Sequence, residues 1–146
     1  MSENIFKVFG KQTKETLLEI IAKCMDDYLF VYDLQNNTIE LSESAVDRFM
    51  ISENVMNDAA NDVLQIVYEE DRKMLQEHLT AIYEGKEKVH NLHYRWLDKE
   101  GMPVWINCRG IVIDDSQGKP QYLVGCLNET AVSYTHLRAH ETTLHL

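Results

Sequence analysis

The sequence is poor in cysteine and in long apolar runs, and each shortage removes a class of protein. Its 146 residues include three cysteines, Cys24, Cys108 and Cys126. An odd number of widely spaced cysteines does not resemble a disulfide framework or a zinc site, and it suits a reducing compartment. No apolar run approaches the ~20 residues of a membrane span, and residues 1–10 lack the apolar core of a secretory signal. We therefore expect a cytoplasmic protein that does not span a membrane.

Basic residues are also scarce. The 14 lysines and arginines face 24 aspartates and glutamates, which gives a formal net charge of -10. No more than two basic residues are adjacent, whereas proteins that bind phosphate backbones or anionic lipid usually present a basic face. The composition therefore argues against nucleic acid and membrane surfaces as partners.

Catalytic motifs are missing as well. No Ser/His/Asp set, phosphate-binding glycine loop or metal-ligating cluster occurs at usable spacing. The acids Glu69, Glu70 and Asp71 are typical of a first helical turn, where the macrodipole favours negative charge. We therefore predict that this chain is not itself an enzyme, with no catalytic residue and no metal site.

The hydrophobic pattern predicts both helices and strands. Residues 11–24 have the spacing of an amphipathic helix, residues 42–50 that of a short helix, and residues 51–68 predict one or two helical turns. Residues 69–84 predict one long helix. In the helix of 1–25 the apolar residues Leu17, Leu18 and Ile21 share a stripe, and we take them as the candidate contact of a homodimer.

Strand patterns occupy the rest of the chain. Residues 28–33 and 38–41 predict a hairpin around an asparagine-rich turn. Residues 89–97, 104–113 and 122–127 alternate with period two and are joined by glycine-containing turns. Segregated helices and strands predict an α+β fold with one antiparallel sheet and helices on one face.

This order of elements, with several local motifs, resembles a PAS domain over about residues 15–130. The helix start at residues 67–72 is similar to the family's V-H-P-x-D-R pattern, with Tyr68 and Glu69 in place of His and Pro. The other matching residues are Tyr94, Arg95, Gly101, Trp105, Arg109, Gly110, Asp114, Gly118, Lys119, Pro120, Leu123, Val124 and Gly125.

The resemblance implies a PAS-like five-stranded antiparallel sheet at residues 26–130, preceded by the amphipathic helix of residues 1–25. It also implies a sensory or dimerisation module of a bacterial signalling protein. Such a module relays its signal to a C-terminal effector, here a missing diguanylate cyclase of the GGDEF type or histidine kinase, in cyclic-di-GMP or two-component signalling. Glu129 takes the place of the acid in the family's closing Asp-Ile-Thr-like motif, so we take it as the candidate signal exit.

The candidate ligand pocket consists of His78, Tyr94, Trp105 and Arg109. Aromatic side chains and one cation would form a wall for a small acidic ligand. The competing interpretation is cross-strand packing, with Arg109 stacked on an aromatic ring or paired to Glu129. We favour packing for these residues.

No cofactor is expected, although the resemblance raises two. A helical histidine binds haem in some PAS domains, but His78 lies about one turn from that position, which Met74 occupies more closely. The run Asn107-Cys108-Arg109 is superficially similar to the flavin motif N-C-R-F-L of other relatives, yet it lies in a strand pattern. We expect His78 and Cys108 to be packed residues, and neither haem nor flavin to bind.

Residues 131–146 follow no pattern continuous with the rest of the chain. They hold His136, His140 and His145, half of the six histidines. This stretch resembles translated sequencing-adapter read-through, so we interpret residues 131–146 as a non-native or disordered tail and expect the native chain to continue beyond about residue 130.

Two other functions stay open. One is a ligand-free dimerisation or protein-interaction domain. The other is a small α+β enzyme of the cone-shaped isomerase type, which would need a buried acid facing its cavity. The inward strand positions supply no clear candidate for that acid.

Overall fold

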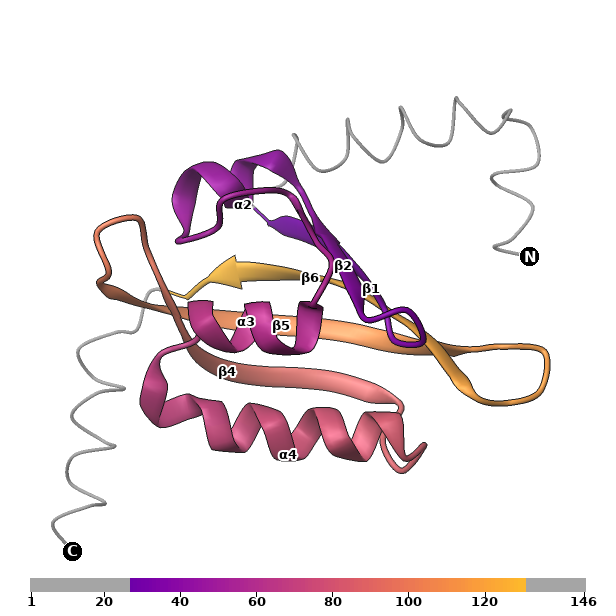
Figure 1. Ribbon diagram of the computed structural model, residues 1–146. Helices are drawn as coiled ribbons and strands as arrows, with labels where there is room; N and C mark the ends of the chain where they lie inside the picture. The colour runs from indigo at the N-terminus through magenta and orange to yellow at the C-terminus, as the bar shows by residue number, and fades with distance from the viewer. Residues whose placement is uncertain (1–26, 131–146) are drawn as a thin grey trace, which may run out of the picture.

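One antiparallel sheet of six strands forms the centre of the protein in the computed structural model, which describes residues 27–130 (Figure 1). The strand order is β3-β2-β1-β6-β5-β4. The sequence-adjacent hairpins are therefore joined through β1 and β6, which pair from Tyr28↔Leu127 to Asp33↔Tyr122. The strands are β1 (Tyr28–Asp33), β2 (Thr38–Leu41), β3 (Val55–Met56), β4 (Val89–Leu97), β5 (Pro103–Asp114) and β6 (Pro120–Glu129).

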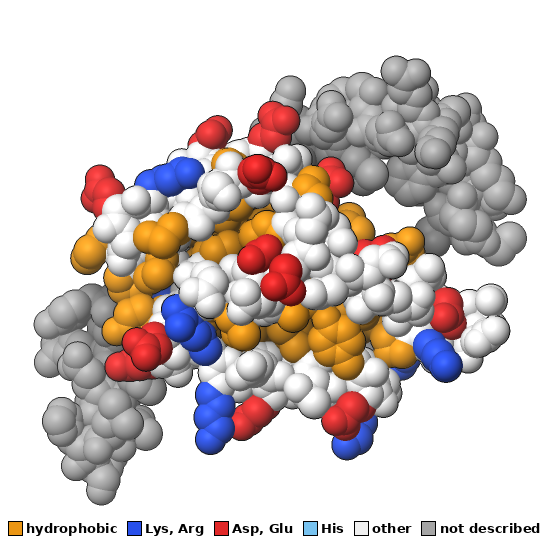
Figure 2. All heavy atoms as spheres, in the orientation of Figure 1, with side chains coloured by type: hydrophobic (Ala, Val, Ile, Leu, Met, Phe, Trp, Pro, Cys, Tyr) orange, Lys and Arg blue, Asp and Glu red, His pale blue; other side chains and the backbone are white. Residues whose placement is uncertain are grey.

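The helices lie together on one side of this sheet (Figure 1). They are α2 (Glu43–Arg48), α3 (Ala59–Ile66), the short 3-10 helix η2 (Glu69–Asp71) and α4 (Arg72–Tyr83). Figure 2 shows this helical side, with hydrophobic side chains reaching the surface in the seam between α3 and α4. Among the described residues, no helix is long and apolar enough to cross a membrane.

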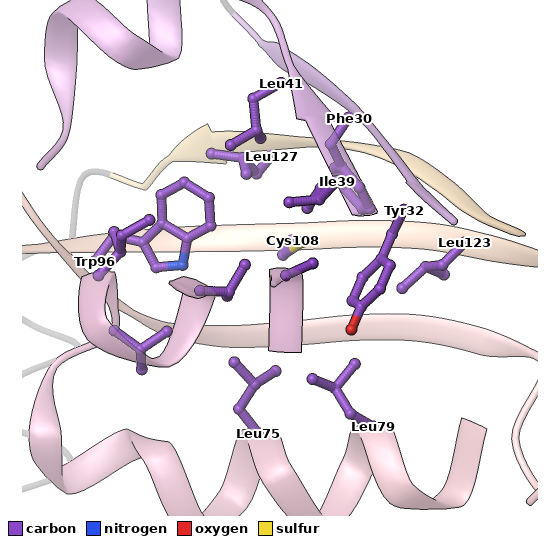
Figure 3. Packing of buried hydrophobic residues seen from close by; sticks show 14 of the residues in the cluster. Phe30, Tyr32, Ile39, Leu41, Leu75, Leu79, Trp96, Cys108, Leu123 and Leu127 are labelled. Carbon is purple, nitrogen blue, oxygen red and sulfur yellow. The ribbon is translucent and has the colours of Figure 1, made fainter. Parts of the chain in front are cut away.

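The core lies between the inner face of the sheet and these helices. Leu75 and Leu79 of α4 point toward the sheet, opposite strand residues from β1, β2, β5 and β6 (Figure 3). Trp96 is buried at one end, and its ring meets Phe49 edge-on with centroids 5.2 Å apart. This packing makes one continuous core, because every strand turns alternate side chains toward the same helices.

A glycine pair joins the two longest strands. Gly110 of β5 lies directly opposite Gly125 of β6. A Cβ atom added to Gly125 would come within 1.9 Å of the carbonyl oxygen of Arg109. A Cβ added to Gly110 would lie 3.0 Å from the carbonyl oxygen of Val124 and 3.1 Å from Leu123 Cδ1. The pair therefore lets the two strands approach more closely than a larger residue at position 125 would allow.

The structure confirms the α+β class and the hairpins, including the turn residue Asn37 at φ 53. It corrects the strand count from five to six, because the two residues of β3 pair with Ile39 and Glu40 of β2. The predicted long helix of residues 69–84 is also divided, since Asp71 ends η2 and turns its carboxylate to the backbone NH of Arg95 instead. The predicted N-terminal helix and the 131–146 tail lie outside the described residues.

Candidate functional site

The four residues of the predicted pocket do not share one site. Tyr94 is buried on the inner face of the sheet, and it pairs with Ile106. Trp105 pairs with Arg95 one position away, so it faces the opposite, outer side, as does Arg109. Because successive strand residues alternate between faces, a single pocket made of Tyr94, Trp105 and Arg109 is excluded, and the prediction of one was wrong.

On the outer face the contacts of Arg109 and Arg95 differ from those predicted. Arg109 lies against Asp27, with Nη2 3.3 Å from a carboxylate oxygen, and neither stacks on a ring nor pairs with Glu129. The stacked arginine is Arg95, whose guanidinium lies 4.3 Å from the ring centre of Tyr68 and 4.7 Å from that of Trp105. Of these contacts the stacking of Arg95 on Trp105 is cross-strand packing, whereas Arg109 makes neither of the two contacts that the competing interpretation named.

The inner face holds a small cavity between the sheet and α3 and α4. Its volume is about 30 Å³, which is enough for one or two water-sized groups. Figure 3 shows most of its wall. The lining residues are Phe30, Tyr32, Ile39, Leu41, Val63, Leu75, Leu79, His90, Tyr94, Trp96, Cys108, Leu123 and Leu127.

Four polar groups interrupt this apolar lining along β4 and β5. The hydroxyl of Tyr94 lies beside the thiol of Cys108 and the indole of Trp96, and burial raises the pKa of Tyr94 well above its usual value. Burial also raises the pKa of Cys108 to about 12. Neither Trp96 Nε1 nor His90 Nδ1, both buried, has a hydrogen-bond partner. Such atoms are costly to leave unpaired, so they are the natural contacts for a polar group entering the cavity.

His90 forms a pair with His78. The two rings come from β4 and α4, with centroids 4.8 Å apart. Desolvation by burial and the neighbouring His78 lower the pKa of His90 to about 4. Burial lowers the pKa of His78 too, opposed by Glu87. Both imidazoles are therefore neutral at pH 7 and able to accept or donate one hydrogen bond.

His90 is the residue that sequence analysis missed. It is 2% exposed, and apart from tyrosine, tryptophan and cysteine it is the one buried side chain with a polar group among residues 27–130. The alternation of β4 could have predicted that His90 faces inward, because it lies two positions before Leu92 and four before Tyr94, which are on the inner face. His78 was expected to be packed and is half-buried, with its Nε2 atom enclosed and unpartnered.

Two tyrosine hydroxyls lie at the other end of the cavity. Tyr32 Oη is 2.5 Å from Tyr83 Oη, and it also donates to Asn37 Oδ1 at 3.3 Å. Burial raises the pKa of both phenols. These bonds link β1 to the last turn of α4 and, through Asn37, to the β1–β2 turn.

The predicted exit residue Glu129 ends β6 within a small ionic network. Its carboxylate accepts two hydrogen bonds from Arg48, each of 2.8 Å, and one of 3.1 Å from the Tyr28 hydroxyl. Arg48 also lies 3.8 Å from Asp98. The hydrogen bond from Arg48 makes the largest contribution to lowering the pKa of Glu129. The network joins α2, the β4–β5 turn and the end of the sheet at one point.

No group of three or more histidine, cysteine, aspartate or glutamate side chains within residues 27–130 is arranged to hold a metal ion. A comparison with family models matches residues 39–127 to the PAS fold. The chain belongs to the PAS-fold family. The matched range of this PAS domain runs from β2 to β6 and includes the residues that line the cavity, except Phe30 and Tyr32 of β1.

Solved structures with the same fold are domains of signalling proteins. A sensory box histidine kinase/response regulator from Burkholderia thailandensis is 17% identical, with a TM-score of 0.61 over 88% of this chain and 92% of that one. The N-terminal domain of a diguanylate cyclase with PAS/PAC sensor from Marinobacter aquaeolei is 16% identical, with a TM-score of 0.56 over 70% and 94%. No curated protein matches the chain. At these identities the likeness establishes the fold alone.

A third solved structure has a similar TM-score at still lower identity. It is a domain of a putative light and redox sensing histidine kinase from Haloarcula marismortui, 13% identical, with a TM-score of 0.60. The alignment covers 80% of this chain and 99% of that one. At 13% identity this likeness, too, establishes the fold alone.

Proposed function

We propose that this PAS domain is the sensory module of a cytoplasmic bacterial signalling protein and that it binds a small ligand in the inner cavity. The observation that carries the proposal is the cavity itself, with unpartnered Trp96 Nε1 in its wall and His90 Nδ1 beside it. A ligand that supplies a hydrogen bond there recovers the free energy lost by burying these groups.

The lining sets the class of ligand. Apolar side chains make up most of the wall, and the nearby histidines are neutral at pH 7. An uncharged molecule with a small apolar body and one hydroxyl, carbonyl or NH group fits these contacts. Ligands of drug size occupy roughly 300–1,000 Å³, so a haem or a flavin would require α3 and α4 to move away from the sheet. We expect no such cofactor.

The path of the signal follows β6. Leu123 and Leu127 of this strand line the cavity, and the strand ends two residues later at Glu129. A ligand that binds one arrangement of these leucines more tightly than another shifts the population of the β6 end. The Arg48–Glu129 contact is where that shift would leave the domain and pass to a C-terminal effector.

We infer the class of the effector from the proteins that contain the structurally similar domains. The similar domains come from histidine kinases and a diguanylate cyclase. We propose that this chain likewise precedes one of these two effectors, and that it acts as a homodimer, as such outputs require two subunits to meet. The fold would be shared whichever effector follows.

The chain offers an internal optical reporter for the test. Of its two tryptophans, Trp96 lines the cavity and Trp105 lies on the outer face. A Trp105→Phe variant leaves Trp96 as the single emitter. Short alcohols, which are of the size of a cavity of about 30 Å³ and do not emit, serve as probes, measured by Trp96 fluorescence and by melting temperature.

Binding by at least one probe, with a fluorescence change and a raised melting temperature, is the expected result. The His90→Phe variant removes the hydrogen-bonding atom and should abolish the response, whereas His93→Gln on the outer face should keep it. If no probe changes the fluorescence of Trp96, the result would favour the ligand-free interaction domain instead.

The ligand-free alternative has one observation in its favour, which is the apolar surface on the outer face of the sheet. The isomerase alternative has none, because no carboxylate lines the cavity in the described part of the chain.

A further inference from the structure

One hydrogen bond lies between the inner cavity and an open groove at the surface. Tyr32 of β1 lines the cavity, and Tyr83 of α4 lines the groove. Their hydroxyl oxygens are 2.5 Å apart, and their rings meet edge-on with centroids 6.4 Å apart. Figure 3 shows the Tyr32 side chain extending from its strand toward α4. The contact between the two tyrosines is therefore a part of the wall that has buried space on one side and solvent on the other.

The groove lies where three turns come together at one end of the domain (Figure 1). Gln35 belongs to the turn between β1 and β2, Gly85 to the loop after α4, and Gly118 to the turn between β5 and β6. The volume of the groove is about 840 Å³, which is within the range of ligand sites in proteins. A small molecule can therefore reach Tyr83 from solvent without the displacement of a helix or strand.

Tyr83 is held less firmly than Tyr32. It is 41% exposed in the last turn of α4, whereas Tyr32 is 3% exposed. Within residues 27–130 the hydroxyl of Tyr83 has one hydrogen bond, the one to Tyr32, while Tyr32 also donates to Asn37 Oδ1 at 3.3 Å. Exposed side chains change rotamer on the picosecond to nanosecond timescale. Rotation of one side chain and loss of one hydrogen bond are thus enough to part the two tyrosines.

The other parts of the cavity wall are more tightly packed. Trp96 closes the opposite end, where its ring packs on that of Phe49, and neither is more than 2% exposed. On the helical side the wall consists of Val63 of α3 and of Leu75 and Leu79 of α4, which are 8% exposed or less. An opening there would need α3 and α4 to move apart, because these side chains lie under the helices that carry them.

We propose that Tyr83 is the gate of the inner cavity, closed while its hydroxyl meets that of Tyr32 and open when its ring turns into the groove. The hydrogen bond to Asn37 keeps Tyr32 in place during this movement. The Tyr32 hydroxyl, released from Tyr83, then becomes the first polar contact for the hydroxyl, carbonyl or NH group of an arriving molecule. The identity of that molecule rests on the proposed function, whereas the route does not.

The thiol of Cys108 reports the opening, because it lines the cavity and is 4% exposed. The full chain carries Cys24→Ser and Cys126→Ser, so that Cys108 is the single thiol. Methyl methanethiosulfonate, which is small and uncharged, is the probe, and labelling is followed by intact mass. The reagent has to reach the cavity to react, so the rate follows the population of the open form.

Two variants of Tyr83 should speed the labelling. Tyr83→Phe removes the hydroxyl and keeps the ring, so we expect a rise of about two- to tenfold, as for the loss of one hydrogen bond. Tyr83→Ala removes the ring as well and should give a larger rise. Met74→Ala is the matched control and should leave the rate unchanged, since Met74 lies on the same helix and is 39% exposed but does not line the cavity.

Urea shows which motion admits the reagent. Labelling through the gate should not change at low urea concentrations, whereas labelling through global unfolding rises with urea throughout. We expect the first behaviour in Tyr83→Ala below its unfolding transition. An unchanged rate in this variant, an equal acceleration in Met74→Ala, or a rate that rises with urea from the lowest concentration would each overturn the gate.

The gate and the binding of a ligand can fail separately, because the thiol experiment uses no ligand. Short alcohols that bind, together with unchanged labelling in Tyr83→Ala, would keep the proposed function and overturn the gate. Faster labelling in Tyr83→Ala without binding of any alcohol would keep the gate and overturn the proposed ligand.

Discussion

Arg48 and Glu129 are joined by two hydrogen bonds of 2.8 Å, although 81 positions separate them in the chain. One residue ends α2 and the other ends β6. A bidentate pair of this kind fixes both distance and orientation. Glu129, the last residue of the sheet and the proposed exit of the signal, is therefore held in place by α2, which lies near the start of the domain in the sequence.

Removing Arg48 and Glu129 singly and together should reveal an energetic coupling between the two side chains. Arg48→Met, Glu129→Gln and the double variant are compared by urea unfolding in a double-mutant cycle. Because both side chains are partly exposed, we expect a coupling of about 1 kcal/mol. The pKa of Glu129 is lowered in the folded state, so this stabilisation is present above the unfolded pKa and is lost as the pH falls through the folded pKa.

The pair Lys88–Asp114 is the matched control for that cycle. It is an ion pair of 2.7 Å between the start of β4 and the end of β5. Its removal should leave the Arg48–Glu129 coupling unchanged, since distant sites behave additively. A coupling near zero at pH 7 would show that the Arg48 contact does not hold the end of β6.

The neutral histidine on the inner face predicts a pH dependence of stability. The pKa of His90 is about 4 in the folded state, below the ordinary value near 6.5. Below pH 6.5 the unfolded chain binds a proton that the folded state does not, so stability falls on acidification until about pH 4. The loss from this one group approaches about 1.4 kcal/mol per pH unit.

The measurement is urea unfolding at pH 7.5, 6.0 and 5.0. His90→Phe should reduce the slope between these values, while His93→Gln on the outer face of the same strand serves as control. An NMR titration of the His90 ring should give a midpoint far below 6.5. A midpoint at or above that value would show that the ring is charged when buried and would remove the basis of this prediction.

The close contact at Gly125 predicts a large effect of one methyl group. Gly125→Ala would place a Cβ within 1.9 Å of the Arg109 carbonyl oxygen, so the paired strands must separate. We expect a loss of about 3 kcal/mol in the free energy of unfolding. Gly118→Asn is the comparison, because Gly118 has φ +79 and open space around it, and asparagine adopts that conformation more readily than other residues. It should cost much less, and equal losses would show that the close approach is not the reason for glycine at position 125.

The two described cysteines should react differently with a thiol reagent. Cys108 is 4% exposed, and burial raises its pKa to about 12. Cys126 is partly exposed beside Arg109 on the outer face. In a Cys24→Ser background, Ellman's reagent at pH 7.5 should modify Cys126 while Cys108 stays protected until the chain unfolds, because the thiolate is the reactive form. Rapid reaction of both thiols would mean that the cavity opens readily.

The local hydrophobic pattern was enough to predict most of the helices and strands. Alternation along β4 and β5 predicted which side chains of each strand share a face, and Tyr94 and Trp96 are indeed buried together. Helical spacing found α4 but not its beginning, because Asp71 turns to Arg95, which is distant in sequence. The two residues of β3 were missed, since so short a strand has no period of its own.

The candidate site depended on contacts that the sequence does not display. Alternation alone leaves open which face the helices cover, and grouping Trp105 and Arg109 with Tyr94 placed residues of both faces in one pocket. The partner of Glu129 was likewise missed, because Arg48 lies in a helix with no pattern that relates it to the last strand.

The sequence by itself determined the α+β class, the PAS resemblance and the alternation of each strand, because these follow from local periodicity and turn chemistry. Only the tertiary structure decided that His78 and His90 meet, that the cavity lies under α3 and α4, and that Arg48 holds Glu129. Those relationships join residues from separate elements, and their geometry is set by sheet order and helix packing rather than by spacing along the chain.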